Sequence, residues 1–131
     1  MILHHVSLVS RDIDRAVAFY RDALGLRQIA RPPFKFPGAW LTSGTVEVHL
    51  IDNPNGTFRS DPVIDTGDCH FAIRVTDFEA AIVGLVAKGY KEDGPPGDLK
   101  TIRMNRNGVV GYPQAYLIDP DWNIVEINAA A

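Results

Sequence analysis

Two histidines, 65 positions apart, begin the same short sequence pattern. His5 opens the segment 5–12 and His70 opens the segment 70–77. In both segments a hydrophobic residue and then a small residue follow the histidine, and an aspartate stands seven positions after it. The alternation of apolar and other residues is typical of a half-buried strand. Because imidazole is the commonest metal-ligating side chain, a repeated strand headed by histidine indicates metal binding.

Two further residues extend this candidate site. The segment 39–41 (Ala-Trp-Leu) matches the segment 115–117 (Ala-Tyr-Leu), and both precede a predicted hairpin turn. If the second turn is one residue longer than the first, His49 becomes equivalent to Glu126, and both stand between aliphatic neighbours. Glu47 lies two residues before His49 on the same strand face and is the alternative. Its equivalence to Glu126 would need a turn three residues longer, so the sequence favours His49.

The candidate ligands are therefore His5, His49, His70 and Glu126. Three imidazoles and one carboxylate suit Zn²⁺, Ni²⁺, Co²⁺, Fe²⁺ or Mn²⁺, and coordinated water would leave room for a chelating substrate. His5, His70 and Glu126 alone also form the two-histidine, one-carboxylate set of non-haem Fe²⁺ oxygenases.

The elements that must position these residues recur in both halves. Apolar residues at helical spacing predict helices over 13–24 and 78–86, and each helix has an aspartate N-cap before it. In the first half, further strands are predicted at 26–30, 39–42 and 46–51. In the second half, they are predicted at 90–93, 115–118 and 124–128, and 101–106 is strand-like. Each half thus reads as strand, helix, strand, strand, strand.

Length predicts one domain, 1–131, made of two modules. Residues 53–68 are rich in Asp, Asn, Gly and Pro and have no sustained apolar period, which is typical of a surface linker. The modules then span about 1–52 and about 69–131. Each module has too small a core for us to expect it to fold alone.

Composition excludes several classes of partner. The net charge of −3 does not indicate nucleic-acid binding, which needs a basic surface. No apolar run approaches the length that spans a bilayer, so no membrane partner is expected. The single cysteine, Cys69, excludes an intrachain disulfide and fits a reducing cytoplasm. Cys69 should point away from His70 as a small buried residue.

Two residues near the histidines need separate interpretation. By strand alternation, His4 should face away from His5 and act as a surface or packing residue. Arg74 shares the face of His70 and needs a partner there. That partner is either an anionic substrate or a carboxylate of the cavity, and the sequence leaves both open.

For several other residues the sequence allows two functional interpretations. Arg103 and Arg106 lie in the predicted 94–112 loop region, where they would either clamp a carboxylate or be solvated. Three aromatic residues would either line a substrate mouth or cover the core. They are Trp40, Phe34 and Phe36.

The sequence resembles the vicinal oxygen chelate superfamily over nearly its whole length. This superfamily includes glyoxalase I, methylmalonyl-CoA epimerase, extradiol dioxygenases, fosfomycin-resistance transferases and bleomycin-resistance proteins. The matching motifs are His5-Val6-x-Leu8 with Asp12, Ala18-Phe19-Tyr20, Leu24-Gly25-Leu26, and Asp119-Pro120-Asp121 followed by Ile124-Val125-Glu126-Ile127. Trp122 stands where a glycine is usual. The segment 31–41, with His49-Leu50, is similar to a glyoxalase-I-like subgroup.

This resemblance implies an α+β fold of tandem βαβββ modules forming a cup-shaped mixed sheet, the glyoxalase/bleomycin resistance/dioxygenase fold. It implies a divalent metal ion that binds two adjacent oxygens of a small substrate. It also allows a thiol such as glutathione to be part of that substrate. Glu126 matches the ligand that doubles as proton shuttle, and Glu47 is a candidate second base or fourth ligand. A homodimer is expected, and the sequence leaves open whether one chain or two build the site.

The leading functional interpretation is a metal-dependent lyase or isomerase of glyoxalase I type. Three histidines and one glutamate differ from the two-histidine, two-glutamate set of glyoxalase I. The alternatives are an Fe²⁺-dependent extradiol dioxygenase, a thiol transferase of the fosfomycin-resistance kind, and a metal-free ligand-sequestering protein like the bleomycin-resistance proteins. Typical extradiol enzymes are longer, with two such domains, and a sequestering protein has no need of an intact ligand set.

Overall fold

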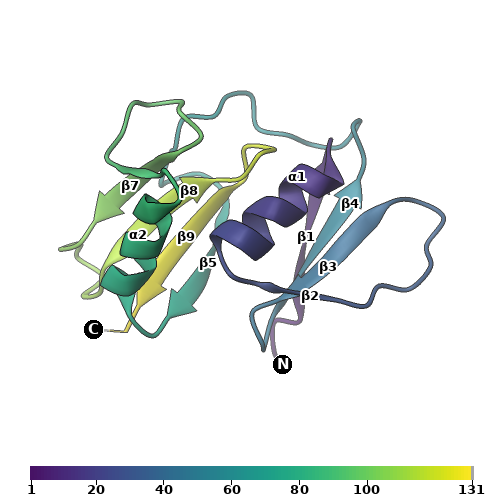
Figure 1. Cartoon of the computed structure of the whole chain (residues 1–131), viewed down its shortest axis with the longest axis horizontal. Coiled ribbons are helices and arrows are strands. Elements are labelled where there is room, and N and C mark those ends of the chain that lie inside the picture. The colour runs from purple at the N-terminus through teal and green to yellow at the C-terminus, as the bar shows by residue number, and fades with distance from the viewer. Residues whose placement is uncertain (131) are drawn as a thin grey trace. The chain divides into compact units, whose positions relative to one another are not determined.

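The computed structural model describes residues 1–130, and contacts within the chain define two compact units (Figure 1). The first spans Met1–Phe58 and the second spans Arg59–Ala131. Each unit is described by itself below. No helix of the described chain is long and apolar enough to cross a membrane.

The first unit is a four-stranded sheet with one helical segment. Its strands are arranged in the order β1-β4-β3-β2, with β1 parallel to β4 and the other pairs antiparallel. The α-helix continues directly into a π-helical turn, and the Asp12 side chain caps its start by accepting from the Arg15 amide. The elements are β1 (His5–Ser10), α1 (Ile13–Val17), η1 (Ala18–Ala23), β2 (Arg27–Ile29), β3 (Gly38–Thr42) and β4 (Glu47–Asp52).

The second unit repeats this arrangement and adds a short edge strand. Its strands follow the order β5-β9-β8-β7-β6, and β5 runs parallel to β9 as β1 does to β4. Helix α2 lies across one face of this sheet (Figure 1). The elements are β5 (His70–Val75), α2 (Phe78–Ala87), β6 (Lys91–Glu92), β7 (Thr101–Asn105), β8 (Gln114–Ile118) and β9 (Ile124–Ala129).

The predicted order of elements is confirmed in both halves, with two corrections near the histidines. Cys69 is exposed rather than buried, because it lies in the polar segment before β5 begins. His4 does not face away from His5, since their Nδ1 atoms are 2.9 Å apart. His4 precedes the first paired residue of β1, so strand alternation does not fix its side chain.

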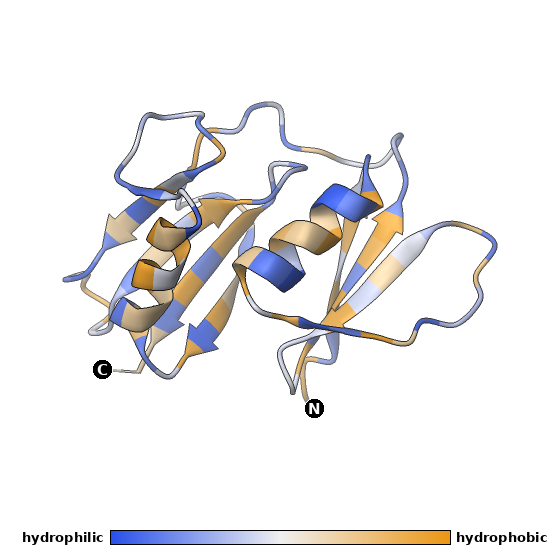
Figure 2. Cartoon of the chain, in the orientation of Figure 1, coloured by the Kyte–Doolittle hydropathy of each residue, from blue (hydrophilic) through white to orange (hydrophobic). Residues whose placement is uncertain are grey.

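Strand alternation gives the second sheet one apolar and one polar face. Blue bands interrupt orange ones along β9 (Figure 2). The apolar face, formed by Ala115, Leu117, Val125 and Ile127, is buried and receives the buried side of α2. The opposite face carries Gln114, Tyr116, Glu126 and Asn128. All four polar-face side chains are also buried, so each needs hydrogen-bond partners.

A tight turn joins β8 to β9 and contains the unusual Trp122. Asp119 is 1% exposed and its carboxylate accepts from the amides of Asp121 and Asn123, at 2.8 Å each. Trp122 has φ of +71°, a left-handed conformation in which glycine is unstrained. The Trp122 side chain packs on a small cluster that includes Tyr116, so packing offsets the backbone strain.

Candidate metal centre

Strand register places His49 and Glu126 at equivalent positions of the two units. The cross-strand pairs are His5–Glu47 and Ser7–His49 in the first sheet, and His70–Ile124 and Ala72–Glu126 in the second. His49 and Glu126 therefore each stand opposite the residue two positions after a leading histidine. The hairpin turns comprise residues 43–46 and 119–123, so the second is one residue longer, as predicted.

In the second unit His70 and Glu126 face each other. The Nε2 atom of His70 lies 3.3 Å from Oε2 of Glu126. The Nδ1 atom of His70 is 2.8 Å from the Asp68 carbonyl oxygen, which only accepts, so Nδ1 carries the proton of this bond. In the neutral ring, Nε2 then presents a lone pair toward a carboxylate oxygen. Two such acceptors are stable together only with a proton or a cation between them, so the pair fits a metal ion.

A chain of amides holds the other oxygen of Glu126. Its Oε1 accepts from Nε2 of Gln114 at 3.1 Å and from Nδ2 of Asn128 at 2.8 Å. Asn105 Nδ2 donates to the Gln114 side-chain oxygen Oε1 at 3.2 Å, and Arg74 Nε donates to Asn128 Oδ1 at 2.8 Å. The amide donors thus form a polar chain that ends on Glu126 from both sides. Arg74 takes the Asn128 amide as its partner, rather than a cavity carboxylate, and its binding of an anionic substrate stays a prediction.

Sequence analysis missed Gln114 and Asn128 as functional residues. A usable signal exists, because Asn128 is two residues after Glu126 and shares its face. Gln114 pairs with Asn128 across the hairpin. Alternation along β9 and the hairpin register together identify both amides.

Tyr116 completes the polar face beside the ligand pair. Gln114 Nε2 donates to its phenolic oxygen at 2.9 Å, and its ring meets the His70 ring edge-on with centroids 5.6 Å apart. Burial, followed by the nearby Glu126 carboxylate, raises the pKa of Tyr116 above its usual value. Tyr116 therefore stays protonated at neutral pH, as a phenol beside an acceptor carboxylate.

In the first unit His49 is held on three sides. Its ring is stacked between those of His5, at 4.1 Å, and Trp40, at 4.0 Å. Its Nε2 lies 2.6 Å from Oε2 of Glu47. This hydrogen bond is the main reason that the pKa of Glu47 lies below its usual value, so the carboxylate is ionised at neutral pH. An ionised carboxylate accepts, so His49 Nε2 donates and Nδ1 keeps its lone pair for a cation.

The remaining predicted residues have mixed placements. Trp40 packs on His49, whereas Phe34 and Phe36 are exposed and stack on each other with centroids 5.3 Å apart. Among residues 1–130, no three His, Cys, Asp or Glu side chains converge in metal-binding geometry. The donor chemistry of His70 with Glu126, and of His49 with Glu47, nevertheless fits a divalent cation.

Arg59 organises the segment that leads to His70. Its Nε donates to Asp68 Oδ2 at 3.0 Å, and its Nη1 donates to the Trp122 carbonyl oxygen at 3.2 Å. Its Nη2 donates to the Val63 carbonyl oxygen at 2.8 Å. Arg59 thus ties residues 59–68 to the β8–β9 turn. Because Asp68 provides the carbonyl that orients the His70 ring, Arg59 also fixes that ring indirectly.

Replacing Arg59 with alanine should weaken metal binding although no ligand is lost. We expect the metal dissociation constant to rise about 10-fold, the lower end of effects seen for groups that orient ligands. Competition with a chromophoric chelator measures it. The Cys69 amide and Arg59 hold the pKa of Asp68 below its usual value, so the ion pair persists to lower pH than an unperturbed aspartate would allow.

Arg21→Ala is the matched control, because Arg21 is exposed and pairs with its neighbour Asp22. This variant should bind metal as the wild type does. Unchanged metal affinity in Arg59→Ala, together with a lower melting temperature, would restrict Arg59 to a stabilising role.

Comparison with known proteins identifies the family to which this chain is similar. The family model described as Glyoxalase/Bleomycin resistance protein/Dioxygenase superfamily matches residues 2–127. An Arabidopsis thaliana protein named "Glyoxylase I 4" is 30% identical over 128 residues, which are 95% of this chain and 68% of that protein. Another Arabidopsis protein, "Probable lactoylglutathione lyase, chloroplastic", is 31% identical over 103 residues. That match covers 76% of this chain but 29% of the relative.

Solved structures share the fold. A lactoylglutathione lyase from Agrobacterium tumefaciens has a TM-score of 0.69 at 21% identity, with 98% of this chain and 93% of that chain covered. A glyoxalase/dioxygenase from Nostoc punctiforme has a TM-score of 0.72 at 19% identity, with 99% and 91% covered. These likenesses confirm the predicted paired βαβββ fold.

Proposed function

Because the chain belongs to the glyoxalase/bleomycin resistance protein/dioxygenase superfamily, we propose that it is a divalent-metal-dependent lyase or isomerase of glyoxalase I type. The substrate is a small molecule with two adjacent oxygens, such as the adduct of a 2-oxoaldehyde and a thiol. One observation carries the proposal. Glu126 has one oxygen bound by two amides and the other directed at His70 Nε2, as a ligand and base requires.

The proposed ligands are His5, His49, His70 and Glu126. A bound Zn²⁺, Ni²⁺, Co²⁺, Fe²⁺ or Mn²⁺ would act as a Lewis acid on the substrate oxygens. Glu47 then has the role of a carboxylate that orients a ligating histidine, because its Oε2 accepts from His49. Its ionised state also keeps it available as the second base.

The chain's own residues supply the proton chemistry. Glu126 takes a proton from the carbon next to the carbonyl at Oε2, because Oε1 is occupied by two amide donors. The same oxygen returns the proton to the adjacent carbon. The protonated Tyr116 phenol lies beside this carboxylate and donates to an oxygen that gains negative charge.

The test combines metal analysis with turnover. Purified protein is stripped of bound metal and reloaded with each of the five ions. It is then assayed with methylglyoxal and glutathione, and afterwards with other thiols. We expect about stoichiometric metal and metal-dependent loss of the adduct. Catechol cleavage with oxygen uptake under Fe²⁺ would favour the dioxygenase alternative instead. Absence of metal uptake would contradict every metal-dependent function.

The proposal includes a homodimer located in the cytoplasm. Resemblance to the family supports the dimer, and the single cysteine supports a reducing compartment. Size-exclusion chromatography with light scattering measures the mass in solution. A mass of one chain would contradict the dimer.

A further inference from the structure

We infer that Arg103 binds a carboxylate of the substrate at the end of a small cavity in the second unit. This inference rests on the proposed function and adds a substrate class to it. The substrate would carry an apolar segment and a single terminal carboxylate in addition to its metal-chelating oxygens.

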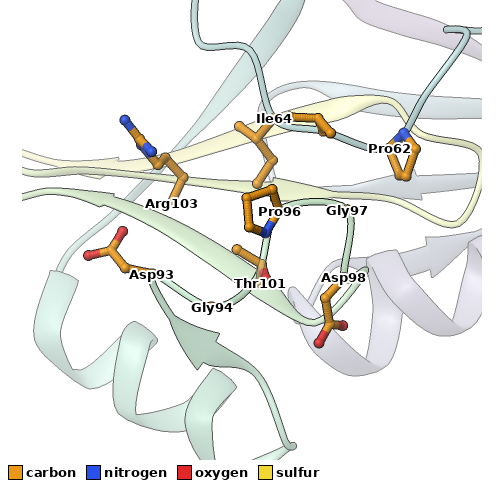
Figure 3. A pocket seen from close by; sticks show the side chains of 10 residues that line it. Pro62, Ile64, Asp93, Gly94, Pro96, Gly97, Asp98, Thr101 and Arg103 are labelled. Carbon is orange, nitrogen blue, oxygen red and sulfur yellow. The ribbon is translucent and has the colours of Figure 1, made fainter.

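The cavity has a volume of about 100 Å³ and lies between the segment before β5 and the β6–β7 connection. Figure 3 shows Ile64 and Pro96 in its middle, with Arg103 and Asp93 at one end. The lining is mainly apolar at the centre, Arg103 is the one cationic side chain among its described residues, and Asp98 lies on the side away from Arg103. A pocket of this kind favours a ligand with an apolar body and one ionised group.

Arg103 differs from the other arginine of its strand region in having no partner. Among residues 1–130 it makes no side-chain hydrogen bond or ion pair, and it is exposed. Arg106, in contrast, is fully engaged, because it binds both oxygens of Glu79 at 2.8 and 3.0 Å and Glu92 at 2.8 Å. Of the two arginines that the sequence suggested as carboxylate clamps, only Arg103 is therefore free to bind a ligand.

Arg103 lies on the same face of the sheet as the proposed base. It pairs with Tyr116 across β7–β8, and Tyr116 pairs with Glu126 across β8–β9. Side chains at paired positions share a face, and two strand spacings separate the Arg103 and Glu126 backbones by about 10 Å. A small substrate can thus reach both residues.

Buried apolar packing links the cavity wall to the polar face. Ile64, which lines the cavity, packs on a buried cluster made of Tyr116, Ile118 and Ile124. Tyr116 belongs both to this cluster and to the polar face beside Glu126. The apolar segment of the ligand would lie against Ile64 and Pro96, which line the cavity.

The charges around Arg103 favour a carboxylate over a more highly charged group. A guanidinium presents parallel donors that match a carboxylate. Asp93 lies at the same end of the cavity, and its Oδ1 accepts from the Met104 amide at 3.0 Å. Asp93 is thus fixed in place, and its charge would repel a dianion more strongly than a monoanion.

The first test measures binding without turnover. The Nε–Hε signal of Arg103 in ¹⁵N-edited NMR spectra is followed during titration with butanoate and with butanamide. We expect butanoate to shift this signal and butanamide to leave it unchanged. Equal responses would overturn the inference. A stronger response to inorganic phosphate than to butanoate would overturn the carboxylate assignment.

The second test measures turnover of two adducts of methylglyoxal, formed with 3-mercaptopropionate and with 2-mercaptoethanol. Arg103→Gln should raise KM about 10-fold for the carboxylate adduct, with a clearly smaller rise for the neutral adduct. Arg106→Gln is the control and should keep the wild-type preference. A shift of the Arg103 signal in a protein without lyase activity would support this inference while contradicting the proposed function. Equal losses for both adducts in Arg103→Gln would overturn the inference.

Discussion

Replacing Glu126 with glutamine is expected to abolish stoichiometric metal binding and to lower kcat by about 100-fold or more. The substitution removes the charge of the proposed ligand and the proton acceptor at Oε2. It keeps an oxygen that can accept from Gln114 and Asn128, so the polar chain and the fold should survive. Metal analysis, steady-state kinetics with the glutathione adduct and thermal unfolding measure the three effects.

Glu92→Gln is the matched control, because Glu92 is an exposed carboxylate outside the polar face of β8 and β9. It should keep full metal content and kcat. If Glu126→Gln retained both as well, Glu126 would be neither ligand nor base, and the proposed mechanism would fail. A large fall in melting temperature would instead assign Glu126 mainly to stability.

The largest expected effect on stability is that of Asp119→Ala in the β8–β9 turn. The Asp119 carboxylate accepts three hydrogen bonds, from the amides of Asp121 and Asn123 and from the Asn123 side chain. Alanine leaves these donors without their charged partner in a buried site. We expect the free energy of unfolding to fall by about 3 kcal/mol, measured by urea denaturation.

Asp119→Asn tests whether hydrogen bonding explains this loss. Asparagine keeps one oxygen for the two amides that bind Oδ1 but cannot accept the third bond, from the Asn123 side chain, at its NH₂ group. The loss should therefore be roughly half that of the alanine variant. Equal losses would show that the charge, rather than the geometry of acceptance, stabilises the turn.

The fold could be predicted because the chain repeats itself. His5 and His70 begin equivalent strands, Asp12 and Asp77 cap equivalent helices, and each carboxylate accepts from the amide three positions later. These are local signals of polarity and capping, which a single sequence displays. The short β6 strand falls within the strand predicted at 90–93, whereas the π-helical turn η1 was not predicted, because residues 13–24 carry only the apolar spacing of one helix.

The candidate site could be predicted only in part. The register of the two sheets confirms that His49 and Glu126 are equivalent. The sequence could predict this equivalence because it depended only on the length of one turn. The Arg74 partner could not be chosen from sequence, because Asn128 becomes its neighbour only when β9 pairs with β5. The prediction that Cys69 is buried was wrong for a related reason, since strand β5 begins one residue after it. The ligand set remains a prediction.

The polar chain around Glu126 has a stereochemical consequence. Its donors converge on Oε1 from both ends, so Oε2 alone can carry a proton. A base with one usable oxygen collects and delivers the proton from a single side of the planar intermediate. The product's new asymmetric carbon should therefore have one handedness, set by the orientation of two amide side chains rather than by the metal.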